Sequence, residues 1–324
     1  MQNSRIEWTD HTFNPWIGCQ KVSPGCKNCY AETYGNRFGV QWGPQGERRR
    51  TSSANWRKPL AWNNAPFVQC DTCGWRGSKR GMAYCLACHG STCTPTRQRV
   101  FCASLADVFE DRPELVPWRA ELFEIIANTP NLDWLLLTKR PEHIRRVWPW
   151  TPTVERPNIW LGTSVENQEQ ANKRIPELLL SPGSVRFLSC EPLLGPVDLT
   201  AIRRPPGFGP AIDWVIVGGE SGPHARPMHP DWARSLRDQC VSANVPFFFK
   251  QWGEYIPFGQ WDASGQDVSD HAVQGFDDVG LPNFSPHTSM FARERTWAWK
   301  VGKHVAGRYL DERIHNSHPH SPRG

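Results

Sequence analysis

Six short apolar runs between residues 100 and 250 limit the folds open to this chain more than any other feature. The runs are rich in branched and aromatic residues and nearly continuous in apolar character, which is typical of strands buried on both faces of a sheet. Their starts are separated by roughly 25 to 35 residues, the length of a strand-plus-helix unit. They occupy residues 100–104, 133–138, 158–163, 185–190, 213–219 and 246–250.

Helical patterns lie between these apolar runs. Helices are predicted over residues 113–129, 165–180 and 229–243, and Pro176 is expected to bend or split the second. Strands and helices that alternate at this period predict a parallel sheet. With residues 14–18 as a first strand, the chain is predicted to be an α/β protein with about seven strands that form a partial or complete parallel (β/α) barrel. A doubly wound sheet is the alternative.

Polar residues follow nearly every predicted strand. In parallel α/β folds the functional site lies at the carboxyl edge of the sheet, where these residues meet. For any single serine or threonine, a helix cap or a turn is the simpler explanation. Charged or amide groups repeat along the whole edge, however, and the repetition predicts a site. The residues in question include Ser104, Lys139, Ser164, Glu166, Glu191 and Glu220.

Three cysteines, Cys19, Cys26 and Cys29, follow the first predicted strand without a fourth ligand nearby. Thiolates suit both iron–sulfur clusters and zinc. Three thiolates can hold three irons of a 4Fe–4S cluster and leave one iron open for a small molecule. The alternative is a structural zinc ion whose fourth ligand is distant, with Cys102, Cys190 or His11 as candidates. The position after a strand favours the cluster.

Residues 62–99 interrupt the apolar pattern and are interpreted as an inserted module. Cys70 and Cys73, then Cys85 and Cys88, form two C-x2-C pairs of the kind found in zinc ribbons. Zn²⁺ would supply the folding energy that the module's few apolar residues cannot. A second iron–sulfur cluster is the alternative metal centre. His89 and Cys93 are alternative ligands.

The N-terminal third is basic and contains interspersed tryptophans. Arginines and lysines among tryptophans suit contacts with phosphates and stacking on bases, so nucleic acid is a predicted partner. A solvated surface is the alternative, and the net charge of +5 demands neither. The basic residues are those of 47–50, Arg57, Lys58, Arg76, Lys79 and Arg80.

The chain shows no secretory signal and no apolar run that could span a membrane, which predicts a cytoplasmic protein with reduced cysteines and no membrane partner. We expect a barrel domain over residues 1–260 that contains the module. Residues 261–324 are expected to form a C-terminal extension whose last ten residues are disordered.

The cysteine triad resembles that of the radical S-adenosylmethionine (radical SAM) superfamily. The usual spacing is C-x3-C-x2-C, whereas this chain has C-x6-C-x2-C, followed by the aromatic Tyr30. A closer resemblance, from Ile6 to Glu254, is to an uncharacterised phage-associated family with a three-cysteine motif that is described as radical-SAM-like. The matching segments include WTDHTFNPWIGC, PGCKNCYAE, LLLTKRPE, WLGTSVENQ, FLSCEPLLGP, WVIVGGESGP and KQWGE.

This resemblance implies a barrel of the radical SAM type, a 4Fe–4S cluster on Cys19, Cys26 and Cys29, and S-adenosylmethionine as cofactor. It further implies a 5′-deoxyadenosyl radical and an external electron donor. A nucleic acid or nucleotide is the expected substrate, in phage-type DNA modification or repair, and any partner protein is unidentified. The alternative is a non-enzymatic, zinc-binding, nucleic-acid-binding protein. The expected cofactor-binding residues are Tyr30, Ser104, Lys139, Ser164, Glu166, Glu191 and Glu220; no catalytic residue is assigned.

Overall fold

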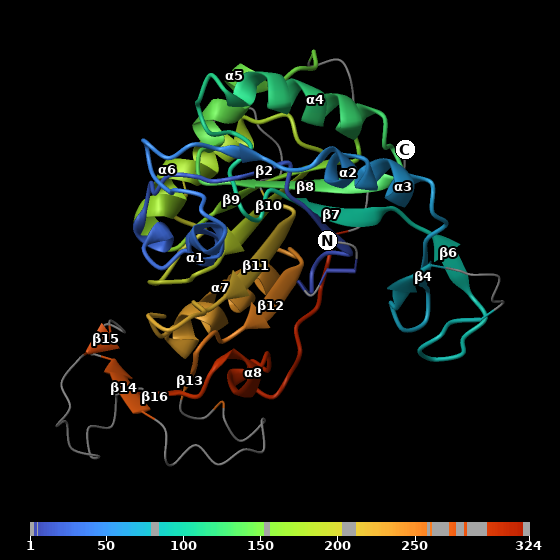
Figure 1. Ribbon diagram of the computed structural model, residues 1–324. Coiled ribbons are helices and arrows are strands. Elements are labelled where there is room, and N and C mark those ends of the chain that lie inside the picture. Colours follow the sequence, from blue (N-terminus) through green and yellow to red (C-terminus); the bar gives the residue numbers. More distant parts are fainter. Residues whose placement is uncertain are drawn as a thin grey trace.

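The computed structural model describes residues 3–319 except 5, 79–83, 152–155, 203–211, 258–259, 261–271, 277–281 and 284–296. Its centre is a half-barrel sheet of seven parallel strands (Figure 1). The strands lie side by side in chain order, and each pairs in parallel with the next. They are β1 (His11–Phe13), β7 (Gln98–Cys102), β8 (Leu132–Thr138), β9 (Ile159–Ser164), β10 (Val185–Cys190), β11 (Trp214–Gly218) and β12 (Phe247–Gln251).

The strand order decides between the two predicted topologies. A doubly wound sheet reverses its strand order at a switch point. Here the order never reverses, so the doubly wound alternative is wrong and the mixed α/β half-barrel is confirmed. All six apolar runs are strands of this sheet, with ends that differ from the predictions by at most two residues.

The predicted first strand is wrong. Residues 14–18 do not belong to the parallel sheet, whose first strand is β1, immediately upstream. Instead, β2 (Trp16–Ile17) pairs antiparallel with β3 (Arg49–Arg50). Pro15 lacks the N–H group that a central strand needs, and β1 is too short to show a sequence period.

Three long helices cover the outer face of the sheet: α4 (Leu115–Ala127), α6 (Gln168–Leu179) and α7 (Pro230–Ser242). Asn167 caps α6 by accepting a hydrogen bond from the backbone of Gln170 at 3.0 Å. Pro176 lies inside α6 and does not split it, contrary to one of the predicted outcomes. The short helices η2 (Pro141–His143) and α5 (Ile144–Val147) follow β8.

Alternate strand residues build two separate cores, because successive side chains of a strand point to opposite faces. On β8, for example, Leu136 packs with the helices, whereas Leu135 packs on the inner face. The inner core is small and aromatic. Its buried members are Trp8, Phe101, Leu135, Trp160, Val185, Phe187, Trp214, Ile216 and Phe248.

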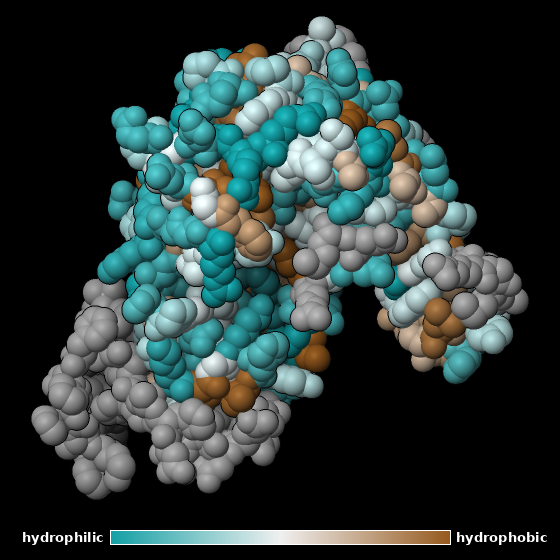
Figure 2. Space-filling model, viewed as in Figure 1, coloured by the Kyte–Doolittle hydropathy of each residue, from teal (hydrophilic) through white to brown (hydrophobic). Residues whose placement is uncertain are grey.

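The long segment between β1 and β7 contains two substructures. The first holds η1 (Pro24–Cys26), α1 (Tyr30–Arg37), α2 (Ser53–Trp56) and α3 (Lys58–Asn63). The second is a three-stranded sheet of β4 (Val68–Cys70), β5 (Arg76–Gly77) and β6 (Cys93–Pro95). In Figures 1 and 2 this second part, the four-cysteine module, projects from the body of the molecule.

The C-terminal part forms an antiparallel sheet of β13 (Tyr255–Pro257), β16 (Trp297–Lys300), β14 (Ala272–Phe276) and β15 (Pro282–Asn283), followed by α8 (Lys303–Ala306). The chain then returns to β12. Ser317 donates its backbone N–H to Phe247, and the indole of Trp214 donates to the Ser317 carbonyl at 2.8 Å. The prediction of disorder is therefore wrong for residues 315–319; residues 320–324 lie outside the described residues. No described helix is long and apolar enough to span a membrane.

Candidate functional site at the carboxyl edge of the half-barrel

The loop of residues 19–29, the cysteine loop, is attached to the carboxyl edge of the sheet through Glu166. The backbone N–H of Gly25 donates to Glu166 Oε1 at 3.1 Å, and Arg174 of α6 forms an ion pair with Glu166 Oε2 at 2.8 Å. Both side chains of this pair are almost fully buried. A Cβ atom at Gly25 would lie 3.0 Å from Glu166 Oε1, so a larger residue here would displace the buried Glu166 side chain by a few tenths of an ångström.

Glu220, after β11, provides a second attachment. Asn28 donates its side-chain amide to Glu220 at 3.0 Å and to the His224 carbonyl at 2.6 Å. The guanidinium of Arg226 binds both carboxylate oxygens of Glu220, at 2.6 and 2.8 Å, and also donates to the Pro24 carbonyl at 3.0 Å. A bidentate pair of this kind has a defined geometry, so it holds the loop in one orientation.

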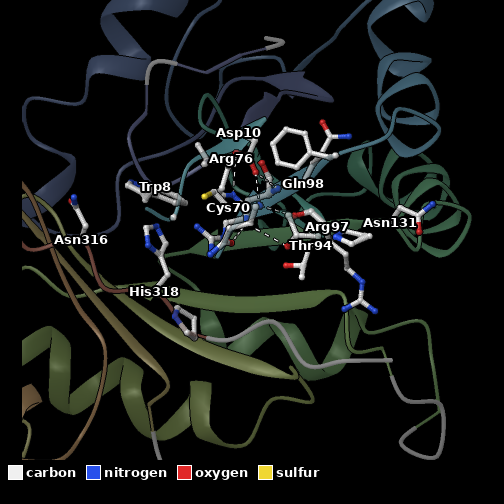
Figure 3. A pocket seen from close by; sticks show the side chains of 18 of the residues that line it. Trp8, Asp10, Cys70, Arg76, Thr94, Arg97, Gln98, Asn131, Asn316 and His318 are labelled. Carbon is white, nitrogen blue, oxygen red and sulfur yellow. Dashed lines mark hydrogen bonds and ion pairs between the residues drawn. The ribbon is translucent and has the colours of Figure 1, made fainter. Parts of the chain in front are cut away.

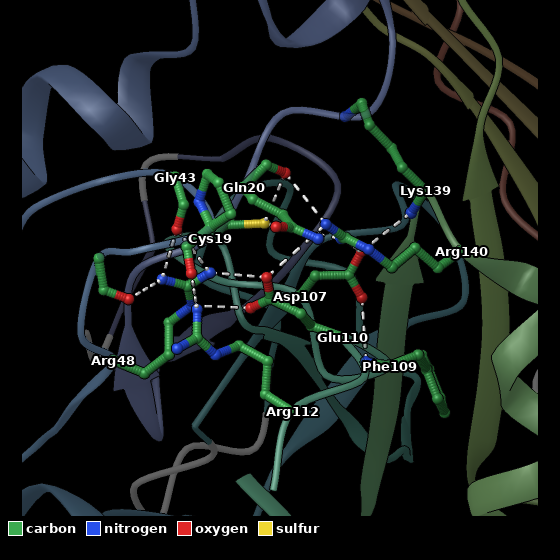
Figure 4. A network of polar contacts seen from close by, with 12 residues as sticks. Cys19, Gln20, Gly43, Arg48, Asp107, Phe109, Glu110, Arg112, Lys139 and Arg140 are labelled. Atoms are coloured by element: carbon green, nitrogen blue, oxygen red, sulfur yellow. Dashed lines mark hydrogen bonds and ion pairs between the residues drawn. The ribbon is translucent and has the colours of Figure 1, made fainter. Parts of the chain in front are cut away.

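Arg140, after β8, provides the third attachment and is the one that reaches a cysteine (Figure 4). Its Nη2 donates to the Gln20 carbonyl at 3.0 Å, and its Nη1 lies 3.7 Å from Cys19 Sγ. Nη1 also contacts Asp107 at 2.8 Å, and Thr138 donates its hydroxyl to the same carboxylate at 2.7 Å. A guanidinium beside a sulfur atom stabilises the thiolate form, which is the form that binds metals.

The pKa values of this cluster follow from burial and charge. Burial alone would raise the pKa of Asp107, but the Arg140 guanidinium and the hydrogen bonds from Thr138, Phe109 and Lys139 lower it below its ordinary value. Burial and the Asp107 charge raise the pKa of Cys19 to about 12, against the opposing effect of Arg140. Without a metal Cys19 is therefore a thiol, and metal binding at this sulfur releases a proton.

A second ion pair lies directly behind this cluster. Arg48 binds Glu110 through two nitrogens, at 2.7 and 2.8 Å, and both side chains are fully buried. Arg48 belongs to the stretch that was expected to form a basic surface, so that expectation is wrong for this residue. Its neighbour Arg50 pairs with Glu121 and lies over the Trp56 ring at 4.2 Å. Lys79 and Arg80, also assigned to that surface, lie outside the described residues.

The inner side of the carboxyl edge is polar. Lys139 donates to Ser164 at 3.2 Å, and Lys250 forms an ion pair with Glu191. Gln251 also donates to Glu191, at 3.3 Å. These side chains come from β9 and β12 and from the residues that follow β8 and β10. The predicted edge residues therefore do gather at one rim.

Tyr30, directly after Cys29, begins α1 and donates its hydroxyl to the Ser104 carbonyl at 2.9 Å. This contact joins the cysteine loop to the residue after β7. The ring itself is largely exposed. Ser104 also exchanges hydrogen bonds with Asn14. The rim thus presents an exposed aromatic ring next to the last cysteine, beside a polar wall.

No described histidine, cysteine or carboxylate joins the three loop thiols in a compact four-ligand set. Two of the candidate fourth zinc ligands, Cys102 and Cys190, are fully buried in the core on the helix side of the sheet. The third, His11, bonds to Gln98 at the opposite, amino edge. The geometry therefore disfavours a structural zinc ion that is completed by one of these three residues.

The four-cysteine module presents a different arrangement. The ligand atoms of Cys70, Cys73, Cys85 and Cys88 all lie within 4.8 Å of one another, so the cluster could bind a metal such as zinc. The Sγ atoms of Cys70 and Cys88 are 3.6 Å apart, as are those of Cys73 and Cys85. A tetrahedral zinc ion with bonds of about 2.3 Å separates its sulfurs by about 3.8 Å, which fits.

Hydrogen bonds act in opposite directions on two of the module's sulfurs. Against the opposing effect of the Trp75 backbone N–H, hydrogen bonds with the other three thiols raise the pKa of Cys73 to about 12. Backbone N–H groups of Cys73 and Thr72, together with the neighbouring thiols, lower the pKa of Cys70 to about 6 despite the opposing effect of burial. The backbone N–H of Ala87 likewise donates to Cys85 Sγ at 3.3 Å. The compact set contains neither His89 nor Cys93, the two alternative ligands.

Several residues that shape the site were missed at the sequence level. Arg174, Arg226 and Asn28 hold the cysteine loop through Glu166 and Glu220, so these two glutamates are occupied by loop contacts. No sequence signal links Asn28 to Glu220, 192 residues away. Arg174 lies eight residues after Glu166, across the start of a predicted helix. This short separation was the one sequence signal that the two side chains could pair.

Comparison with known proteins gives one match. No curated protein and no solved structure matches the chain. One family model, described as "Protein of unknown function (DUF5131)", matches residues 3–319 and therefore nearly the whole chain. The half-barrel, the cysteine loop and the four-cysteine module all fall within this match, and the protein belongs to this DUF5131 family.

Proposed function

We propose that this protein is a radical SAM iron–sulfur enzyme whose cluster is bound by Cys19, Cys26 and Cys29. The observation that carries the proposal is the attachment of the cysteine loop to the carboxyl edge of a parallel half-barrel by Glu166, Glu220 and Arg140. Sites of parallel α/β folds lie at that edge. A loop with only a structural role has little need of three attachments to the carboxyl edge of the sheet.

The residues present fit a 4Fe–4S cluster. Three soft thiolate donors on one loop match three irons, and the cluster's fourth iron then needs no protein ligand. The Arg140 guanidinium, 3.7 Å from Cys19 Sγ, offers a positive charge to a cluster with anionic ligands. Ser23 Oγ, 3.8 Å from Cys26 Sγ, offers a second polar contact to a ligating sulfur.

The rim residues suit S-adenosylmethionine, which carries an ammonium, a carboxylate and a sulfonium. When bound at the cluster, this cofactor supplies radical hydrogen abstraction, after an external donor has provided one electron. In this chain, Lys139 and Lys250 offer positive charge to the carboxylate, and Glu191 offers negative charge to the ammonium. The Tyr30 ring, beside Cys29, offers an aromatic surface to the adenine.

We further propose that the four-cysteine module holds a structural zinc ion. The support is the compact set of four thiols at the spacing of a tetrahedral ion. A nucleic acid or a nucleotide in phage-type modification or repair is the substrate class that accords with the resemblance of the cysteine loop and its neighbouring motifs. A zinc-binding, non-enzymatic nucleic-acid protein is the competing function, and metal analysis separates the two.

Anaerobic purification and reconstitution, followed by iron, sulfide and zinc analysis, test the proposal. The wild type should hold about four irons, about four sulfides and about one zinc per chain, with a visible absorbance band that bleaches on reduction. Cys26→Ala should lose the iron and keep the zinc. About two zinc ions and no iron in the wild type would refute the radical mechanism and favour the zinc-binding protein.

A further inference from the structure

A large cavity lies at the amino edge of the half-barrel, away from the cysteine loop. Its volume is about 1700 Å³. Its walls come from the residues around the starts of β1, β7 and β8, from the four-cysteine module and from the returning C-terminal segment. In Figure 3, Trp8, His318 and Asn316 lie on one side of this cavity, and Arg97 and Asn131 lie on the other. Neither the proposed iron–sulfur cluster nor the proposed zinc ion gives this cavity a function.

Arg99, the second residue of β7, is the unusual group in this cavity. Its side chain is 6% exposed, and its guanidinium lies over the Trp160 ring at 5.7 Å. Its Nε is buried without a hydrogen-bond partner, and no described carboxylate forms an ion pair with it. A buried charge without a partner costs free energy, which an anion in the cavity would recover.

The nearby carboxylates compensate Arg99 only in part, because Asp10 and Asp133 act on its charge from a distance and each also faces another arginine. Asp10 pairs with Arg76 at 2.8 Å, and Asp133 lies 3.7 Å from Arg97. Of the other acidic groups on the cavity wall, Asp71 accepts a hydrogen bond from Thr94, and the exposed Glu7 acts on Arg308. Among the described residues, Arg99 is therefore a buried arginine on the cavity wall without an ion-pair partner of its own.

Other unpartnered nitrogens belong to residues that line the same cavity. Trp8 Nε1, Arg308 Nε and His318 Nε2 are buried and have no hydrogen-bond partner in the part of the chain that the structure describes. Arg308 donates through another nitrogen, to Asn316, and packs over the Phe248 ring at 5.1 Å. Trp8 Nε1 and Arg308 Nε are donors, and they favour a ligand that is rich in acceptor oxygens. His318 already donates to the Asn316 backbone, so Nε2 of its neutral ring is an acceptor.

We propose that this cavity binds the phosphate groups of a nucleic-acid strand, with Arg99 as its central anchor. Phosphodiesters are anionic and acceptor-only, and guanidinium groups match their oxygens. A strand is favoured over a small ligand because the cavity exceeds the ~300–1,000 Å³ of small-molecule pockets. The arginines that line the cavity also lie on separate segments of the chain, as contacts with successive phosphates require. The proposal is independent of the iron–sulfur chemistry.

The ionisation states agree with this geometry. Burial lowers the pKa of Arg99 to about 9, which leaves it charged at neutral pH. Burial and the charges of Arg99, Arg76 and Arg308 lower the pKa of His318 far below its ordinary value, so that ring stays neutral. Binding should therefore be insensitive to pH around neutrality.

Fluorescence anisotropy with the full-length, metal-loaded protein tests the proposal. The probe is a fluorescein-labelled single-stranded DNA of about 16 nucleotides, the upper end of known single-strand site sizes. Arg99→Gln should weaken binding about tenfold or more, as expected for a lost charge-assisted contact. It should also reduce the slope of log affinity against log salt by about one. Arg308→Gln, less buried and safer for folding, should weaken binding severalfold.

Arg145→Gln is the matched control, because Arg145 is exposed and lies elsewhere on the protein. It should bind the probe as the wild type does. Equal affinities of Arg99→Gln, Arg308→Gln and the wild type would overturn the proposal, as would an equal loss in the control. Circular dichroism checks the fold of each variant. If AMP displaced the probe at equal nucleotide concentration, the strand assignment would be wrong.

Discussion

The two cysteine sets of this protein differ in what holds their sulfur atoms in place. In the four-cysteine module, the ligands come from one short segment, and the sulfurs already lie at the spacing of a single tetrahedral ion. In the cysteine loop, the sulfurs are not gathered into such a set. The loop is positioned instead by Arg140, Glu166 and Glu220 of the half-barrel.

This difference separates two uses of cysteine. A local set closes around its own metal and can fold with it, so it depends little on the rest of the protein. A loop held by distant side chains is instead positioned beside a particular surface of the protein. Here that surface is the polar rim with Lys139, Glu191 and Lys250. The comparison predicts that the two sets fail independently, and mutation can test this.

The largest effect is expected from Cys85→Ser, which removes a fully buried sulfur of the module. If the module holds zinc as proposed, the variant should lose the zinc entirely, and the module should become sensitive to protease because the metal would supply its folding energy. Iron loading of the cysteine loop should not change. Zinc analysis and limited proteolysis measure the first two effects. Loss of iron together with zinc would contradict the independence of the two sets.

Glu166→Gln should have the next largest effect. It leaves Arg174 as an uncompensated buried charge, so the free energy of unfolding should fall by about 3–5 kcal/mol in urea titrations. It also weakens the attachment of Gly25, so iron loading should fall while zinc content stays constant.

A matched control for Glu166→Gln lies on α6 itself. Glu177 forms an exposed pair with Arg145 at 3.5 Å, and Glu177→Gln should change stability by less than about 1 kcal/mol. If both variants lost the same stability, or if Glu166→Gln kept full iron loading, the attachment argument would fail.

Asp107→Asn should have the smallest effect, because Arg140 also lies 3.8 Å from a second carboxylate, Glu110, and so keeps an opposite charge. The expected loss at neutral pH is about 1.5–3 kcal/mol, the range for a hydrogen bond to a charged group. The variant is recognised by how its free energy of unfolding depends on pH. Because folding lowers the pKa of Asp107, its ionised form stabilises the protein above the unfolded-state pKa. That stabilisation is lost as the pH falls through the lower, folded-state pKa.

The wild type should therefore lose more stability on acidification than Asp107→Asn does. Urea unfolding at a series of pH values below neutrality measures the two slopes. Parallel curves would show that the Arg140 contact contributes no pH-dependent stability. Zinc content should be equal in both proteins, since Asp107 lies beside the cysteine loop and not in the module.

Much of the fold was predictable because its signals are local. Strands β7 to β12 are buried on both faces and therefore appear as apolar runs, and their spacing identifies the crossover helices. The first strand was misplaced because His11–Phe13 is too short for a pattern and is defined only by its pairing with β7. The ordered segment 315–319 was missed because polar residues dock there through backbone hydrogen bonds to β12.

The sequence alone was enough to predict a parallel α/β sheet, the polar residues at its carboxyl edge and the four-cysteine cluster, whereas the choice of a half-barrel over a doubly wound sheet came from the strand order. Each of the three predictions depends on residues that are close in the chain or repeat with a fixed period. The packed structure shows that Glu166 and Glu220 hold the cysteine loop and that Arg140 reaches Cys19. It also shows that Arg99 is buried over the Trp160 ring with no ion pair to any described residue. The loop contacts join residues more than a hundred positions apart, so no local sequence pattern reveals them. The burial of Arg99 is likewise invisible in the sequence, because pairing and burial are properties of the packed molecule.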